Sequence, residues 1–121
     1  AGTDRVLFIA DREMRLTSAT FRITTKGGSS YAALLKKADS GTAIGSGTAI
    51  AASAAIGSTA TNNANVTAAP VLADAVVSAG QSVGIDFSGT TGSAANLTVT
   101  LTFRRVIAPT RQYLSTTTDE S

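Results

Sequence analysis

Residues 94–106, AANLTVTLTFRRV, alternate between apolar and polar side chains with a period of two residues. One face of this stretch holds Leu97, Val99, Leu101 and Phe103, and the other holds Thr98, Thr100 and Thr102. Successive side chains of a β-strand point to opposite sides, so the pattern predicts a strand with one buried face. Because such a strand packs its apolar face against a second sheet, we expect an all-β protein.

The composition limits the size and the chemistry of the core. A chain of 121 residues forms one domain with one modest core. Apolar residues make up 43% of the chain, but aromatic residues only 5%, so the core must consist of Val, Ile, Leu, Ala and the four Phe. The absence of cysteine excludes a disulfide scaffold and a zinc-thiolate site, so stability must come from packing or from oligomerisation.

The first two strands are predicted near the N-terminus. Residues 5–10, RVLFIA, have the β-branched and aromatic content of a strand. Residues 14–25 alternate in their second half, with Phe21 and Ile23 on the apolar face. Leu16 joins that face only if one extra residue intervenes, which predicts a bulge near residues 17–18.

Turn signals rich in glycine separate the later strands. Residues 26–29 predict a hairpin turn, and residues 31–37 then predict a strand, although one or two helical turns would also fit this stretch. Residues 39–41 predict a second turn. Residues 82–87 alternate clearly and predict another strand, followed by a turn over residues 89–92.

The middle of the chain is harder to interpret. The sequence GTAI at residues 41–44 recurs at residues 47–50. A solenoid would need this repeat to continue for many turns, and it occurs only twice. Residues 51–56 predict a strand in a crowded place where only small side chains fit, and residues 62–65 predict a loop. Residues 70–80, PVLADAVVSAG, fit a short strand or a single helical turn equally well, because proline can begin a helix and glycine can end one.

These elements predict an antiparallel β-sandwich or jelly roll with a short N-terminal and a longer C-terminal arm. The expected boundaries are an arm at residues 1–4, the sandwich at residues 5–106 and a second arm at residues 107–121. No run of about 18 apolar residues predicts a membrane span, and no signal peptide is visible. We therefore expect a soluble chain without a membrane partner.

The sequence argues against an enzyme. It contains no histidine, which is the usual base at neutral pH, and no serine lies in a nucleophile elbow. Asp11 and Glu13 would face the same way in an extended chain and could bind calcium, but a solvated turn that balances Arg12 and Arg15 is the favoured interpretation. Asp86 is expected on a solvent face or supporting a turn. We predict no catalytic residue, no cofactor and no metal.

The charges are segregated along the chain. Every lysine and arginine lies in residues 5–37 or 104–111, whereas residues 41–103 hold only Asp74 and Asp86 as charged groups. The basic set consists of Arg5, Arg12, Arg15, Arg22, Lys26, Lys36, Lys37, Arg104, Arg105 and Arg111. If the first and last strands approach each other, Arg5 and the Arg104–Arg105 pair could form one positive patch, and ordinary solubilising charge is the alternative. The scarcity of aromatic residues favours a protein over a nucleic acid as its partner.

The order of these segments resembles a known family. RVLFIA, LTSATFRITTKGG, YAALLKKADSGTAIGSGTAI, VVSAGQSVGIDFSGT and NLTVTLTFRRV follow one another as in the small jelly-roll decoration, or cement, proteins of tailed-phage heads. The resemblance covers residues 5–106 and rests on the pattern of strands and turns. It implies a structural virion protein on the outer surface of the capsid, which binds the major capsid protein and clamps its subunits together.

The resemblance also implies a homo-oligomer, a trimer, whose contacts are ordinary polar and apolar side chains. For docking to the capsid we single out Arg5, Arg104, Arg105 and Arg111, with Tyr113 and Leu114 as apolar anchors in the tail. The alternative is a receptor- or carbohydrate-binding β-sandwich module of a head fibre or tail. That class predicts exposed aromatic platforms, for which only Tyr31 and Tyr113 are candidates.

Overall fold

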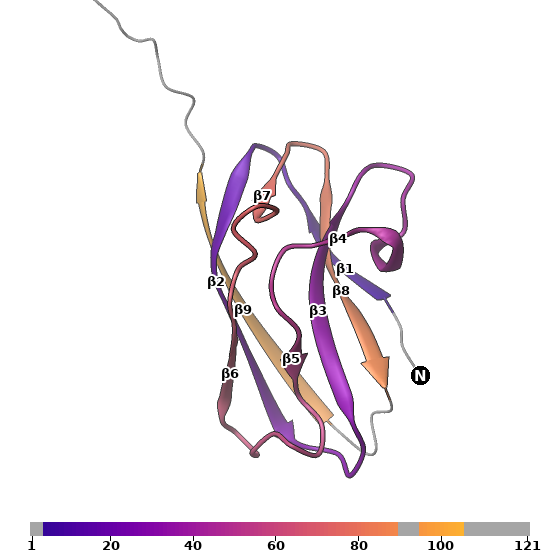
Figure 1. Ribbon diagram of the computed structural model, residues 1–121, viewed down its shortest axis with the longest axis vertical. Coiled ribbons are helices and arrows are strands. Elements are labelled where there is room, and N and C mark those ends of the chain that lie inside the picture. The colour runs from indigo at the N-terminus through magenta and orange to yellow at the C-terminus, as the bar shows by residue number, and fades with distance from the viewer. Residues whose placement is uncertain (1–3, 90–94, 106–121) are drawn as a thin grey trace, which may run out of the picture.

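The computed structural model describes residues 4–89 and 95–105 of the chain. Two antiparallel sheets pack against each other, and the long strands of one sheet cross behind those of the other (Figure 1). The predicted all-β, antiparallel sandwich is therefore confirmed. The first strand begins at Asp4, and the last described strand ends at Arg105. The predicted C-terminal arm lies outside the described residues.

The first sheet has five strands. Its order is β1 (Asp4–Ile9), β8 (Ser82–Gly89), β3 (Tyr31–Ala38) and β4 (Thr48–Ala49), and β5 (Ala54–Ala55) also pairs with β3. The central strands β3 and β8 pair in continuous register from Tyr31 opposite Gly89 to Ala38 opposite Ser82. β1 pairs with β8 and has no second strand partner among residues 4–89 and 95–105.

The second sheet is organised around β2 (Met14–Thr25). One edge of β2 pairs along almost its whole length with β9 (Ala95–Arg105). The other edge pairs with the short strands β6 (Asn65–Ala68) and β7 (Val76–Val77). The predicted bulge is confirmed, because the register between β2 and β9 shifts between Leu16 and Ser18. At this bulge the Thr17 hydroxyl donates a hydrogen bond of 3.0 Å to the Thr102 carbonyl.

The core lies between the sheets and uses the alternating side chains that the sequence indicates. The largest fully buried side chains are Phe21, Leu16, Ile23, Leu35, Ile50, Ile56, Ile85, Val77 and Val83. Alanines from both sheets fill the space between them, including Ala19, Ala33, Ala54, Ala68 and Ala75. Burial of each large apolar side chain contributes about 1.5–3 kcal/mol, so these residues supply most of the favourable free energy of folding.

One side of the sandwich is closed by backbone hydrogen bonds. Ala51 bridges to Pro70, the Ala52 amide donates to the Ala69 carbonyl at 2.8 Å, and the Val71 amide donates to the Ile50 carbonyl at 2.9 Å. These bonds join the segment between β4 and β5 to the segment after β6, and therefore link the two sheets. The Lys37 ammonium adds a further link, since it donates a hydrogen bond of 2.6 Å from β3 to the Val76 carbonyl of β7.

In the middle of the chain the structure corrects two predictions and decides a third that the sequence leaves open. Residues 51–56 are crowded as predicted, but only β5 within them is a strand. Residues 62–65 were predicted to be a loop, whereas β6 begins at Asn65. Residues 70–80 contain a turn followed by a strand. The Asp74 amide donates a hydrogen bond to the Val71 carbonyl, and β7 begins at Val76. The partners of these segments are distant in sequence, so local pattern cannot fix their bounds.

The two GTAI segments, residues 41–44 and 47–50, have different surroundings. Ile50 is fully buried in the main core. Ile44 begins the short 3₁₀ turn η1 (Ile44–Ser46), is 2% exposed, and packs over β8 at Gly84. A Cβ at Gly84 would lie 2.8 Å from Ile44 Cγ1 and 2.5 Å from the Arg5 carbonyl oxygen. Because Gly84 has no side chain, Ile44 of η1 can pack directly against the backbone of β8.

Replacing Gly84 tests this close packing. Gly84→Ala should lower the free energy of unfolding by about 1–3 kcal/mol, because the new methyl group meets both a backbone oxygen and Ile44. The matched control is Gly28→Ala, since a Cβ at Gly28 would meet no atom within 4 Å. Denaturant titration of both variants measures the effect. Equal stability of the two variants would contradict the packing of η1 on β8.

Candidate functional site: the open side of the sandwich

The side opposite the backbone bridge is formed by β1 and β9. β2 has β6 and β7 on one edge, so β9 on its other edge has no second strand partner within the described chain. β1 and β9 meet at Phe8 and Phe103, whose ring centroids lie 5.5 Å apart in an edge-to-face arrangement. We call this side, formed by β1 and β9, the open side.

The open side exposes apolar side chains. Val6 is 55% exposed and Ile9 68% exposed, and Leu7 between them is also exposed. A strand with one buried face would show one exposed and one covered row, but in β1 only Phe8 is half-buried and the other residues are exposed. The inward residues of β9, Leu97, Val99, Leu101 and Phe103, are likewise only partly buried. Exposed apolar groups beside strand edges are typical of surfaces that bind another protein.

Basic side chains gather at the C-terminal end of β9. Arg104 lies opposite Arg15 in the pairing of β9 with β2, and Arg105 follows it. We call Arg15, Arg104 and Arg105 the basic end. Arg15 donates a hydrogen bond of 3.1 Å to the Leu72 carbonyl, whereas neither Arg104 nor Arg105 forms an ion pair with any described acidic residue. Like charges opposite each other in a sheet repel, so an acidic partner would stabilise this end.

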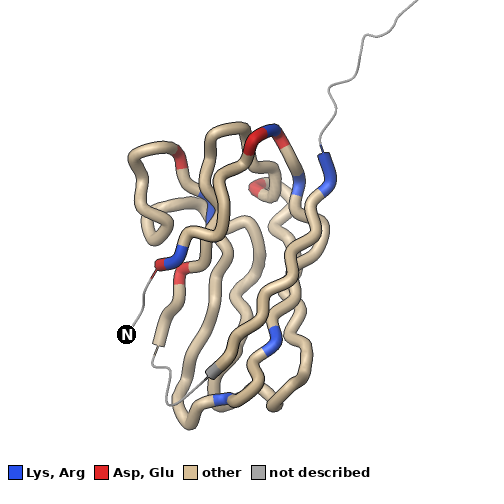
Figure 2. Tube along the Cα trace, turned by 180° about the vertical axis from the view of Figure 1, so that it is seen from behind, with Lys and Arg blue, Asp and Glu red and all other residues tan. Residues whose placement is uncertain are grey.

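The positive patch that the sequence analysis supposed for Arg5 and the Arg104–Arg105 pair does not form among the described residues. The first and last strands do approach, as the sequence analysis supposed, but the contact lies at Phe8 and Phe103. Figure 2 shows the basic segment at the start of β1 beside the N-terminus and the basic end of β9 on a separate part of the molecule. Arg5 therefore stands apart from Arg104 and Arg105. The remaining docking residues, Arg111, Tyr113 and Leu114, lie outside the described residues.

An ion pair on the outer face of the first sheet holds β1, η1, β3 and β8 together. The Lys36 ammonium lies 2.9 Å from an Asp86 carboxylate oxygen and also donates a hydrogen bond of 2.8 Å to the Gly45 carbonyl. The Gly45 amide in turn donates to the Asp4 carboxylate at 2.9 Å. Asp86 is on the outer face, as its alternation predicts, but it is partly buried under Lys36. The expectation of a solvent-face or turn-supporting residue therefore missed this ion pair.

The hydrogen bond from Lys36, opposed by desolvation, lowers the pKa of Asp86 below its ordinary value of 3.8. A carboxylate with a lowered pKa in the folded state stabilises the protein above its ordinary pKa, and this contribution is lost as the pH falls through the lowered value. The ion pair is therefore fully stabilising at pH 7 and disappears in acid.

Removal of the ammonium tests this contribution. Lys36→Met keeps most of the side-chain volume and should lower the free energy of unfolding at pH 7 by about 1–2 kcal/mol. At a pH below the lowered pKa of Asp86 the loss should shrink to the part due to the Gly45 hydrogen bond. Lys26→Met is the control, because Lys26 is exposed and forms no ion pair with a described residue. Denaturant titrations at both pH values measure the difference, and a pH-independent loss would contradict the role of Asp86.

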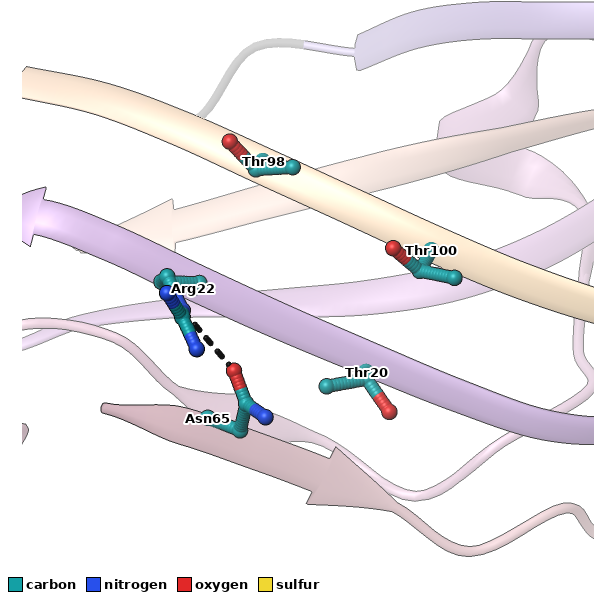
Figure 3. A pocket seen from close by; sticks show the side chains of 5 residues that line it. All are labelled: Thr20, Arg22, Asn65, Thr98 and Thr100. Atoms are coloured by element: carbon teal, nitrogen blue, oxygen red, sulfur yellow. Dashed lines mark hydrogen bonds between the residues drawn. The ribbon is translucent and has the colours of Figure 1, made fainter. Parts of the chain in front are cut away.

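A shallow polar hollow lies on the outer face of the second sheet. It has a volume of about 490 Å³ and is lined by Thr20 and Arg22 of β2, Asn65 of β6, and Thr98 and Thr100 of β9. The Arg22 Nε donates a hydrogen bond of 2.9 Å to the Asn65 Oδ1, and the three threonine side chains surround this pair (Figure 3). The hollow thus offers hydroxyl groups and a guanidinium, with no aromatic ring among its lining residues. The alternation of threonines indicates this polar face in the sequence, but the part played by Asn65 depends on the unpredicted strand β6.

The other candidate groups show no catalytic arrangement. Asp11 pairs with its neighbour Arg12 at 3.3 Å, which lowers the pKa of the exposed Asp11 carboxyl. Among residues 4–89 and 95–105, no three acidic side chains come close enough together to hold a metal ion. The Tyr31 ring stacks on Phe87 with centroids 5.5 Å apart, and burial raises the pKa of its hydroxyl. One face of the Tyr31 ring is therefore turned toward Phe87.

Comparison of the chain with protein-family models, with curated proteins and with solved structures gives no match. The described residues also contain no helix with the length and apolar character of a membrane span. The class that fold and site define is thus an antiparallel β-sandwich with an open, partly apolar side.

Proposed function

We propose that this chain is a structural virion protein that decorates the outside of a phage head and stabilises contacts between major capsid protein subunits. The single observation that supports this proposal most is the open side, where an exposed apolar strand lies beside a second strand that has no outer partner among the described residues. Such a surface suits attachment to protein and needs no reactive group. The resemblance of the strand and turn pattern to decoration proteins supplies the phage head as its setting.

The basic end would determine the orientation of the sandwich on the shell. Arg104 and Arg105 form no ion pair with a described acidic residue, although the charge of Arg105 contributes to lowering the pKa of Asp11, and Arg15 places a further charge opposite Arg104. An acidic patch on the capsid protein would relieve this repulsion and would orient the sandwich on the shell. The same charges would repel other copies of this end, so neighbouring decoration proteins would contact one another through other surfaces.

A sedimentation experiment with undecorated phage shells tests the proposal. The purified chain should cosediment with assembled shells and should not bind isolated capsid subunits, because a clamp recognises neighbouring subunits together. Absence of binding to shells would overturn the proposed function.

The docking role of the basic end is tested in the same assay. Arg104→Glu combined with Arg105→Glu should weaken binding to shells at least tenfold, which corresponds to about 1.4 kcal/mol. Arg22→Glu combined with Lys26→Glu is the matched control, since it reverses the same amount of charge elsewhere on the second sheet and the turn after it. If both double variants bind shells as the parent does, the basic end only confers solubility.

A receptor- or carbohydrate-binding module is the second candidate, and the polar hollow favours it. Hydroxyl groups and the Arg22 guanidinium are suitable partners for sugar hydroxyls, although the hollow lacks the stacking ring that such sites commonly use. A glycan array is the discriminating measurement. Binding that is lost in Arg22→Ala and kept in Lys26→Ala would support this candidate, whereas no binding to any glycan would remove it.

A further inference from the structure

The edge of β9 is a long strand edge without the usual protection against pairing. Natural edge strands are commonly blunted by charged side chains, proline or bulges. Between Leu97 and Phe103, β9 has no charged residue and no proline, and the bulge in this pair of strands lies on β2 at Thr17. Asn96, at the start of the strand, adopts a left-handed conformation with a φ of 63°. Residues 4–89 and 95–105 provide no strand that covers this edge. No strand of the described chain therefore pairs with the backbone groups of β9 that point away from β2.

The sequence of β9 is complementary to itself in the antiparallel direction. If a second β9 pairs about Thr100, Val99 faces Leu101 and Leu97 faces Phe103 of the other copy. Thr98 then faces Thr102. The apolar face of one β9 therefore continues into the apolar face of the other copy, and the threonine face continues in the same way. A shift by one residue would place apolar side chains opposite threonines. The alternation therefore excludes registers shifted by an odd number of residues, and among those it allows, the pair centred on Thr100 overlaps the whole of β9, Ala95–Arg105.

The charges favour the same arrangement. In the antiparallel pair centred on Thr100, Arg104 faces Asn96, and the two basic ends lie at opposite ends of the joined strands. A parallel pair would place Arg104 and Arg105 beside their own copies, and the repulsion would oppose association. Charge distribution thus selects the twofold, antiparallel pair over a parallel one.

The area available is close to that of a stable interface. Eleven residues of β9 span about 35 Å, and two sheets about 10 Å apart, with the side chains on their outer faces, form a side wall about 20 Å wide, which offers at most about 700 Å² for each copy. Specific interfaces bury about 800 Å² for each partner. The exposed Val6, Leu7 and Ile9 of β1 flank the edge and supply apolar area in addition to the hydrogen bonds of the strands.

From these observations we propose that the open side binds a second copy of this chain, through antiparallel pairing of β9 with β9 about Thr100. The second sheet of each sandwich then continues into that of its partner. This inference does not rest on the proposed attachment to phage heads, and because both use the open side, a copy paired in this way would not attach to a shell through that side. It assigns a twofold contact to the chain, in place of the threefold association that the resemblance implies.

The first test is the mass of the purified chain by analytical ultracentrifugation over a range of concentrations. The parent should form a dimer. Thr100→Lys should dissociate the dimer at least tenfold more readily, because the two new ammonium groups face each other at the twofold axis. Thr20→Lys is the matched control: Thr20 lies opposite Thr100 on the same face but in the interior of the sheet. A monomeric parent, a trimer, or equal effects of both variants would overturn the proposal.

The second test uses the absence of cysteine from the chain. In an antiparallel pair, directly opposite Cα atoms lie about 4.5–5.5 Å apart, within the range that a disulfide spans. Oxidation of Thr98→Cys mixed with Thr102→Cys should therefore give a linked dimer of the two variants, because these positions face each other. Each variant alone should link far less, and Thr20→Cys should not link. Equal linking by all variants would show random collision and would contradict the register.

Discussion

The structure depends on the packing of two apolar sheet faces through side chains that alternate along β2, β3 and β8. Phe21, Leu35 and Ile85 are fully buried between the sheets, and small alanines let the sheets approach each other. No cysteine is available to hold them together. The remaining polar links, such as the hydrogen bond from Lys37 to Val76, lie at the rim of this core and join elements that the packing has already brought close.

The two lateral sides of the sandwich are closed in different ways. On one side, backbone hydrogen bonds between residues 50–52 and 69–71 join the two sheets. On the other, β1 and β9 meet only through side chains, with Phe8 against Phe103, and no described strand follows either. Apolar groups on β1 stay exposed as a result. The proposals for shell attachment and for twofold pairing both derive from this difference.

The long strands could be predicted from the sequence because their pattern is local. The alternation of β8 and β9 and the displaced Leu16 that indicates the bulge in β2 need no knowledge of the partner strand. The short strands β4, β5, β6 and β7 have two to four residues, too few for a period to show, and they are defined by distant partners. Ile44 and Ile50 illustrate the limit, since identical local sequences place one on the outer face of a sheet and the other in the core.

The candidate site was less predictable than the fold. The sequence indicated a basic set and an approach of the first and last strands, but it could not show that both faces of β1 remain exposed or that Lys36 binds Asp86. These features depend on which neighbour each residue meets. The docking roles of Arg5, Arg104 and Arg105 remain predictions, and Arg5 stands apart from the other two.

Amide hydrogen exchange, measured residue by residue at low and at high protein concentration, tests the central claim most directly. The account predicts that amides of β2, β3 and β8 are protected at both concentrations. Alternate amides of β9, those that point away from β2, should exchange rapidly in dilute protein and become protected in concentrated protein. Uniform protection of β9 in dilute protein, or exchange of β9 that is the same at both concentrations, would contradict the claim that the open side is the surface that binds.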